Sequence, residues 1–268
     1  MSLNNQLSRN QHIYLKEMCK DLHLKYSCTA FDLDSLIFLD KKINIPFFKI
    51  ASGEIHSLDI LNYISISKKP IILSTGMANF NDITKSLKIL KKNKKRKITL
   101  LHCVSSYPTN LKDMNLVRMR NLKNKFKLDV GLSDHSVSFV PAIIAATNEA
   151  TVIEKHVTFS KKLNGPDHKA SLDIHQFSDF VNYIREAEIL NNSKFLKHTG
   201  DELNVKKVSR KSIVSSNFIP KGKKISEIDI CFKRPGYGIS PLDLRKVIGK
   251  RTLKSIKENS LIFMKDLI

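Results

Sequence analysis

The chain has 268 residues, of which 41% are hydrophobic, enough for one large core and a second small domain. No apolar run approaches the roughly 20 residues that span a bilayer, and no stretch has the order of a signal peptide. The four cysteines form no Cys-x-x-Cys pair and no disulfide-like spacing, as is typical of reduced, mostly buried thiols. We therefore expect a soluble, cytoplasmic protein with no membrane partner.

From about residue 10, short β-rich runs alternate with helical stretches, which predicts βα units around a parallel sheet. Amphipathic segments at 81–92 and 139–150 predict helices between the runs, and a longer helix at 174–190 follows the last run. Six strands are two short of a (β/α)8 barrel, so the predicted fold class is α/β, an incomplete TIM-type barrel. The six predicted strands are 24–31, 47–52, 70–75, 98–104, 128–132 and 151–157.

The densest run of positive charge, KKNKKRK at 91–97, lies where a helix should end before a strand. It has no aromatic side chain for base stacking, and cations at that position interact favourably with the helix dipole. The formal net charge of +21 therefore does not lead us to expect a nucleic-acid partner, and an anionic small substrate accounts for it equally well. A basic nucleic-acid-binding module is the alternative from a different class of protein.

The character of the chain changes after Asn191. Residues 192–210 are polar and of mixed charge, as is typical of a linker. Residues 211–268 carry short apolar runs broken by glycines and prolines, which predicts a small, mostly β domain. A domain of about 60 residues is marginally stable alone, so we expect docking or dimerisation. The predicted division is a barrel domain at 1–191, a linker at 192–210 and a β domain at 211–268.

Every predicted strand ends in a polar cluster. In a βα barrel the carboxyl ends of the strands form the mouth in which the active site lies. Because buried polar groups must all find partners, hydroxyl-rich clusters at all six ends are difficult to explain by packing alone. The clusters are CTAFD, ASGE, STGM, HCVSSYP, LSDHS and EKHVT.

Two histidines follow neighbouring strand-like runs, His135 in GLSDHS and His156 in IEKHVTF. Their separation fits one strand, helix, strand unit, which would point both imidazoles into the same cavity. Together they suit a divalent metal ion with open positions for water and substrate oxygens. A pair of hydrogen-bonded core histidines fits the spacing equally well.

One cation and several hydroxyls surround the same predicted mouth, and this mixture is what phosphate binding requires. Strand-end capping is the competing explanation for each hydroxyl. Glu54 and Asp167 add carboxylates, although Asp167 lies in a turn-forming sequence. No Gly-rich nucleotide loop is present. The predicted phosphate ligands are Lys49, Thr29, Ser52, Ser74 and Ser133.

Seven motifs occur in an order that resembles the sialic acid synthase family, the NeuB type that makes N-acetylneuraminate and related nonulosonates. The resemblance extends from about residue 10 to the C-terminus and implies a metal-dependent barrel, a small antifreeze-like (SAF) domain and a domain-swapped homodimer. The motifs are FKIASGE, PIILSTGM, LLHCVSSYPT, GLSDHS, IEKHVTF, GPDHKAS and KRPGYGISP.

The resemblance also implies a role for individual residues. His135 and His156 would bind Mn²⁺ or Mg²⁺, and Ser105 would join the five predicted phosphate ligands in holding phosphoenolpyruvate. Arg234 would reach into the partner subunit's site and contact the N-acyl group of the sugar. The residues implied to face the sugar are Glu54, Tyr107, Asp167 and Arg234, and those implied in catalysis are Glu54, Lys49 and His135.

The implied reaction condenses phosphoenolpyruvate with an open-chain N-acetylmannosamine-type sugar to give a nine-carbon 2-keto acid and phosphate. The sugar could instead be a diacetamido-trideoxy hexose that leads to legionaminate or pseudaminate. Members of the family begin with two further strands, which carry EIG-type and VKFQ-type motifs, whereas this chain opens in the helix before the third strand. We therefore expect the chain alone to be inactive or unstable, either as a remnant that still binds metal or ligand or as one half of a split synthase.

Overall fold

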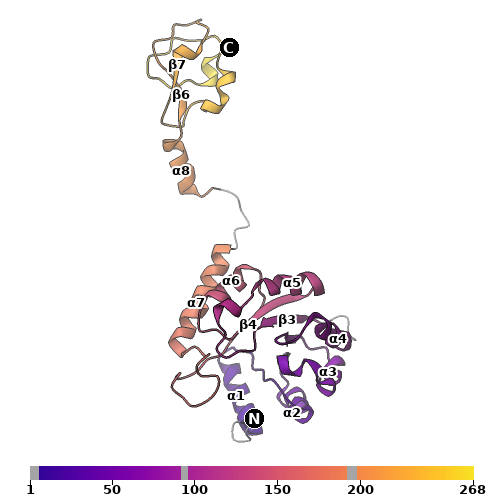
Figure 1. Ribbon diagram of the computed structural model, residues 1–268. Coiled ribbons are helices and arrows are strands. Elements are labelled where there is room, and N and C mark those ends of the chain that lie inside the picture. The colour runs from indigo at the N-terminus through magenta and orange to yellow at the C-terminus, as the bar shows by residue number, and fades with distance from the viewer. Residues whose placement is uncertain (1–5, 92–95, 192–197) are drawn as a thin grey trace. The chain divides into compact units, whose positions relative to one another are not determined.

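The computed structural model describes residues 6–91, 96–191 and 198–268, and the chain divides into the units Met1–Ser193 and Lys194–Ile268. The first unit holds a five-stranded parallel sheet whose strands are neighbours in chain order (Figure 1). Parallel strands in chain order, joined by helices, are the arrangement of a βα barrel, so the predicted α/β class is confirmed. The strands are β1 (Phe48–Ile50), β2 (Ile71–Ser74), β3 (Ile98–Cys103), β4 (Asp129–Asp134) and β5 (Ile153–Lys155).

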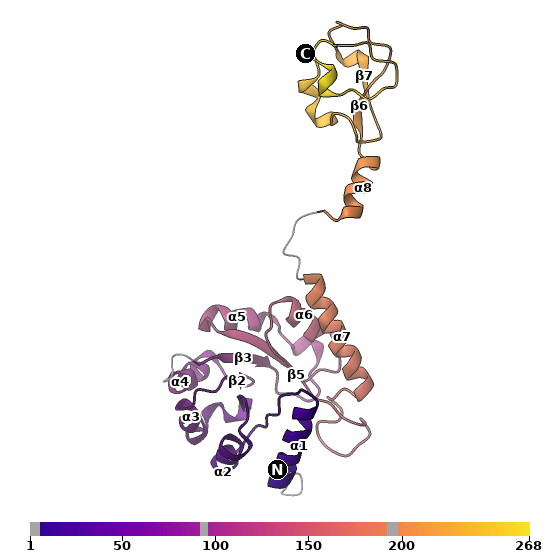
Figure 2. The same ribbon diagram turned by 180° about the vertical axis from the view of Figure 1, so that it is seen from behind.

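The helices between strands follow one another around the outside of the sheet (Figures 1 and 2). In α4, Ile83, Leu87 and Leu90 recur at helical spacing and are buried. Asn79 starts this helix with a capping box, because its side chain accepts from the amide of Asp82 and the Asp82 carboxylate accepts from the amide of Asn79, both at 3.0 Å. The helices of this unit are α1 (Arg9–Asp21), α2 (Leu33–Phe38), α3 (Leu58–Ser65), α4 (Phe80–Leu90), α5 (Val117–Phe126), α6 (Val140–Thr147) and α7 (Ile174–Asn191).

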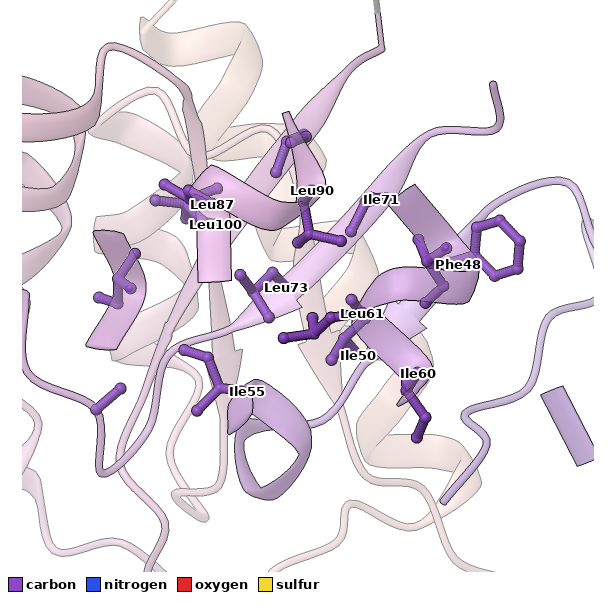
Figure 3. Close-up of a cluster of buried hydrophobic side chains, with 14 of the residues drawn as sticks. Phe48, Ile50, Ile55, Ile60, Leu61, Ile71, Leu73, Leu87, Leu90 and Leu100 are labelled. Carbon is purple, nitrogen blue, oxygen red and sulfur yellow. The ribbon is translucent and has the colours of Figure 1, made fainter. Parts of the chain in front are cut away.

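The hydrophobic core of this unit lies between the sheet and these helices. Phe48 and Ile50 of β1 are almost completely buried, and Figure 3 shows Ile50 near Leu61 and Leu73. Successive side chains of a strand point to opposite faces, so Lys49, between these two core residues, points to the other face of the sheet. The packing of the core therefore decides which polar side chains face away from it.

The prediction of a strand at 24–31 is wrong, and the sheet has five strands where six were expected. The amide of Leu24 donates to the carbonyl of Cys19 at 2.7 Å, which extends the end of α1. Ser27 reaches β1 only through its side chain, which donates to the carbonyl of Phe47 at 3.0 Å. Tyr26, Cys28 and Ala30 of this segment pack against the core, but its backbone makes no described hydrogen bond to a strand.

Arg96 belongs to the basic run at 91–97, of which residues 92–95 lie outside the described part of the chain. Its guanidinium is buried and donates to the carbonyls of Ile64 and Ser65 at the end of α3 and to that of Leu90 at the end of α4. Carbonyls at a helix end lack partners within the helix and carry partial negative charge. Arg96 thus caps two helices at once, in agreement with the expected interaction between this run and a helix dipole.

The second unit is built around the antiparallel strands β6 (Ser212–Ser215) and β7 (Ile230–Lys233). Its separate core includes Ile213, Val247 and Ile262, all fully buried. Isolated bridges such as Val214 with Leu261 continue the β structure towards the C-terminus. This agrees with the small, mostly β domain predicted for this part of the chain.

The segment predicted as a linker contains a helix, α8 (Gly200–Ser209), and its residues 192–197 lie outside the described residues. A capping box explains the helix: the Glu202 amide donates to Thr199 Oγ1 at 3.2 Å, and the Thr199 amide donates to the Glu202 carboxylate at 2.9 Å. Lys206 and Lys207 in the last turn suit the helix dipole. Within the described ranges, no helix is long and apolar enough to cross a membrane.

Candidate active site

Polar side chains from all five strands meet around a cavity of about 330 Å³ at the carboxyl ends of the strands. The pairing of neighbouring strands explains why these side chains meet. Cys103 is paired with Ser133, and Ser133 with Glu154, and all three lie on the face of the sheet that points away from the core. The structure brings together here most of the residues predicted from the sequence. Those that line the cavity are Thr29, Lys49, Ser52, Ser74, Tyr107, Ser133, His135 and His156.

Lys49 is the predicted cation of this cavity, and its side chain is only 13% exposed. Its ammonium donates to Ser74 Oγ at 2.9 Å and lies 3.4 Å from a carboxylate oxygen of Glu154. The other carboxylate oxygen of Glu154 accepts from Ser133 Oγ at 2.6 Å. A fixed positive charge among hydroxyl donors is the arrangement that binds an anion such as phosphate.

His135 and His156 lie beside this network, with their ring centres 5.4 Å apart and Nε2 of His135 3.2 Å from Ser133 Oγ. The Nδ1 atom of His135 is 2.8 Å from the carbonyl of Val104, which can only accept, so Nδ1 carries the proton. Burial lowers the pKa of His135, and the neighbouring His156 lowers it further. The ring is therefore neutral at pH 7, and its Nε2 presents a lone pair near Ser133 Oγ.

Tyr107 forms a wall of the cavity next to both histidines. Its ring centre lies 4.2 Å from that of His135 and 5.8 Å from that of His156. Burial raises the pKa of Tyr107, and the acidic groups of Cys103, Asp167 and Glu154 add to this increase. The phenol is therefore protonated at neutral pH and can donate a hydrogen bond to a ligand.

The two histidines have features of a metal site. A metal-binding histidine normally donates its other ring N–H to a carbonyl or carboxylate, and His135 donates to Val104. Among the residues that the structure describes, no group of three or more His, Cys, Asp and Glu side chains has metal-binding geometry. The residues fit a divalent ion held by two imidazoles, with its other positions open to water and substrate oxygens.

A buried ion pair lies behind the two histidines, on the face of the sheet towards the helices. Lys155 Nζ is 2.8 Å from the Asp134 carboxylate, and the two side chains are 1% and 0% exposed. Burial lowers the pKa of Lys155, but the Asp134 charge opposes this. Asp134 directly precedes His135, and Lys155 directly precedes His156.

Four predicted site residues do not line the cavity. Ser105 lies just outside it, with its hydroxyl 3.3 Å from that of Ser52. The carboxylate of Glu54 accepts a hydrogen bond from Ser57, and Asp167 is exposed in the loop after β5. Arg234 is exposed in the second unit.

Sequence reasoning assigned no role to several residues that border the cavity, and Glu154 is the most important of them. Alternation along the strand could have identified it, because Glu154 precedes the predicted ligand His156 by two residues and so shares its face. Cys103 precedes Ser105 by two residues in the same way. The residues without an assigned role are Phe31, Ala51, Cys103, Glu154 and Lys155.

Two family models match this chain, one for each of its two units. The sequence model of the NeuB family matches residues 1–195, and that of the SAF domain matches residues 210–268. The chain belongs to the NeuB family. Its second unit is a SAF domain, as the sequence motifs predicted.

Relatives of this NeuB-family chain include sugar-acid synthases. It is 39% identical to N,N'-diacetyllegionaminic acid synthase of Campylobacter jejuni, over 96% of this chain and 77% of that protein. It is 32% identical to the N-acetylneuraminic acid synthetase of Leptospira borgpetersenii, over 74% of this chain and 69% of that structure, with a TM-score of 0.68. The spore coat polysaccharide biosynthesis protein SpsE of Bacillus subtilis is 27% identical, over 98% and 78% of the two chains, with a TM-score of 0.65. The family to which this chain belongs therefore includes nonulosonate synthases.

Proposed function

We propose that the cavity condenses phosphoenolpyruvate with an N-acetylmannosamine-type sugar to give a nine-carbon 2-keto acid and phosphate. One observation supports this most strongly: Lys49, hydrogen-bonded to the hydroxyl of Ser74, shares a single cavity with His135 and His156. An anion site and a pair of imidazole ligands in the same cavity suit a phosphorylated donor and a polarised acceptor. Family membership supports the same chemistry.

In the proposed reaction, C3 of phosphoenolpyruvate attacks the aldehyde carbon of the open-chain sugar, and the aldehyde oxygen takes up a proton. Water adds to C2 and loses one proton to leave a C2 hydroxyl. The C2–O bond to the phosphate group then breaks while this hydroxyl loses its proton, which releases phosphate and leaves the keto group. His135 and His156 would hold a divalent ion, Mn²⁺ or Mg²⁺, whose chemistry is to polarise the aldehyde oxygen. No oxidant or reductant is needed.

The other residues act by binding and orientation. Lys49 would bind the phosphate group as a point charge while Thr29, Ser52, Ser74 and Ser133 donate hydrogen bonds, with Ser105 behind Ser52. Glu154 would hold Lys49 and Ser133 in position before the donor arrives, because one of its oxygens accepts from Ser133 and the other forms an ion pair with Lys49.

Residues around the rim of the cavity would recognise the sugar. Tyr107 would donate a hydrogen bond from its phenol, and the carboxylates of Glu54 and Asp167 would accept from sugar hydroxyls. In a domain-swapped homodimer, Arg234 of one protomer would contact the N-acyl group of the sugar bound by the other.

A diacetamido-trideoxy hexose is the second candidate acceptor, leading to legionaminate or pseudaminate. The 39% identity to a diacetyllegionaminic acid synthase favours the legionaminate precursor. N-acetylmannosamine differs from this sugar by carrying hydroxyls where the other carries an acetamido group and a hydrogen. The two acceptors can therefore be compared directly on the same purified chain.

The test is to incubate the full chain with phosphoenolpyruvate, Mn²⁺ and each acceptor, and to measure phosphate and keto acid together. Stoichiometric release of both with one acceptor, lost in His135→Ala, would establish the proposed function and would contradict the expectation that this chain alone is inactive. The exposed His175 offers a matched control, and His175→Ala should retain full activity. Mn²⁺ binding that depends on His135, without turnover of either acceptor, would instead identify a remnant that only binds.

A further inference from the structure

The ion pair of Asp134 and Lys155 joins the two strand ends that carry the histidines. The residues are register partners in β4 and β5, and their charged groups are 2.8 Å apart. In each strand the charged residue comes directly before the histidine, so the pair and the histidines lie on opposite faces of the sheet. The pair therefore fixes the backbone from which both rings project.

Further hydrogen bonds extend this link to the loop after His135. Asp134 Oδ1 accepts from the amide of Ser136 at 2.9 Å, and Lys155 Nζ donates to the carbonyl of Ser136. Both polar groups of that peptide segment are thus held by the buried pair. His135 lies between two residues, Asp134 and Ser136, that cannot move independently of β5.

A buried ion pair needs an explanation other than stability. Taking both charges out of water costs about as much as their attraction returns, and apolar residues of similar volume often serve equally well. The Lys155 ammonium also lies 5.8 Å from the ring centre of Phe180 in α7, so the surroundings are apolar on that side. The hydrogen bonds to Ser136 give the pair a geometric role that apolar side chains would lack.

We propose that Asp134 and Lys155 are positioning residues that set the separation of His135 and His156 for metal binding. This inference rests on the proposed function, because that function assigns the metal to the two histidines. The charged groups of the pair lie on the other face of the sheet from the histidines, so the pair acts on them through the backbone. Replacing both residues by apolar side chains of similar volume should therefore preserve the fold but make the separation of the two histidine rings less well defined.

The experiment uses the double variant Asp134→Leu/Lys155→Met in the full chain. We expect a melting temperature close to wild type, weaker ring-to-ring proton NOEs between His135 and His156 in metal-free protein, and a dissociation constant for Mn²⁺ raised about 10- to 100-fold. Asp40 and Lys69, another pair at 2.8 Å, provide the matched control Asp40→Leu/Lys69→Met, in which NOEs and Mn²⁺ affinity should not change.

Unchanged NOEs and Mn²⁺ affinity in a folded double variant would overturn the proposal and leave the pair a purely structural role. If wild type itself binds no Mn²⁺, the proposed function fails, and the NOEs of the metal-free proteins still decide the positioning role. Should the double variant not fold, Asp134→Asn keeps an acceptor for the Ser136 amide and removes the charge. Its NOEs and affinity should then change in the same direction by a smaller amount, and no change would overturn the proposal.

Discussion

The ammonium of Lys49 lies 3.4 Å from the carboxylate of Glu154, inside the cavity proposed to receive a phosphate group. The Lys49 cation of this anion site therefore faces a competing negative charge before any ligand binds. An incoming phosphate must share Lys49 with Glu154, so Glu154 sets both the position of the cation and the strength of anion binding.

Glu154→Gln should strengthen the binding of phosphoenolpyruvate several-fold. The amide keeps an acceptor for Ser133 and removes the negative charge beside the phosphate. Titration of phosphoenolpyruvate by calorimetry measures the effect. An unchanged or weaker affinity would show that Glu154 does not oppose the bound phosphate.

Lys49→Met should weaken the binding of phosphoenolpyruvate about 10- to 100-fold, which corresponds to the loss of a hydrogen bond to a charged group of about 1.5–3 kcal/mol. Lys85 lies on the exposed surface of α4, and Lys85→Met should bind as wild type. The same calorimetric titration compares the two variants. Equal affinities would exclude Lys49 as the phosphate ligand.

Arg96→Met should lower the free energy of unfolding by about 3 kcal/mol, because carbonyls at the ends of α3 and α4 lose a charged donor while remaining buried. Urea denaturation of the full chain measures this loss. Lys97 is its neighbour in sequence and 64% exposed, so Lys97→Met should change stability by less than about 1 kcal/mol. Equal effects of the two substitutions would contradict the double-capping role.

The SAF domain should lose stability in acid through Asp229. Burial by itself would raise the pKa of this carboxyl, but hydrogen bonds from Lys223 and Ser226 outweigh it and lower the pKa below its usual value. A lowered folded pKa adds stability above the unfolded pKa of about 3.9, and this is lost as the pH falls through the folded pKa.

Amide hydrogen exchange of Ile213 and Val214 in β6 can follow this loss as the pH is lowered from about 5 to 2, after correction for the intrinsic exchange rate. In Asp229→Asn the protection should be lower at neutral pH and should depend less on pH. A wild-type acid profile in that variant would assign the loss to other carboxylates.

Much of the fold and the site follows from local pattern. Apolar runs predicted β1 to β5, and alternation along a strand explains why Lys49 and Ser133 share one face. His135 and His156 were predicted as neighbours from a spacing of one strand, helix, strand unit, and their rings are 5.4 Å apart. These predictions succeed because they depend on backbone geometry that is repeated in every βα unit.

The features that sequence reasoning missed depend on long-range partners. Whether residues 24–31 join the sheet depends on backbone hydrogen bonds to a neighbouring strand, which the segment's own residues do not reveal. The pairing of Asp134 with Lys155 requires the register of β4 and β5, and the capping by Arg96 joins the ends of two separate helices. The helix α8 is different, because the Thr199–Glu202 capping box could have predicted it from the sequence. The polar composition of the segment led instead to the prediction of a linker.

The most direct test of the proposed chemistry uses phosphoenolpyruvate with heavy oxygen in the bridge between C2 and phosphorus. The purified full chain is incubated with Mn²⁺ and the accepted sugar, and phosphorus NMR follows the label. Cleavage of the C2–O bond predicts that the released phosphate carries the heavy oxygen, that His135→Ala releases none, and that Lys49→Met releases it more slowly. Label left in the keto acid, or label released equally by these variants, would contradict a condensation carried out by this cavity.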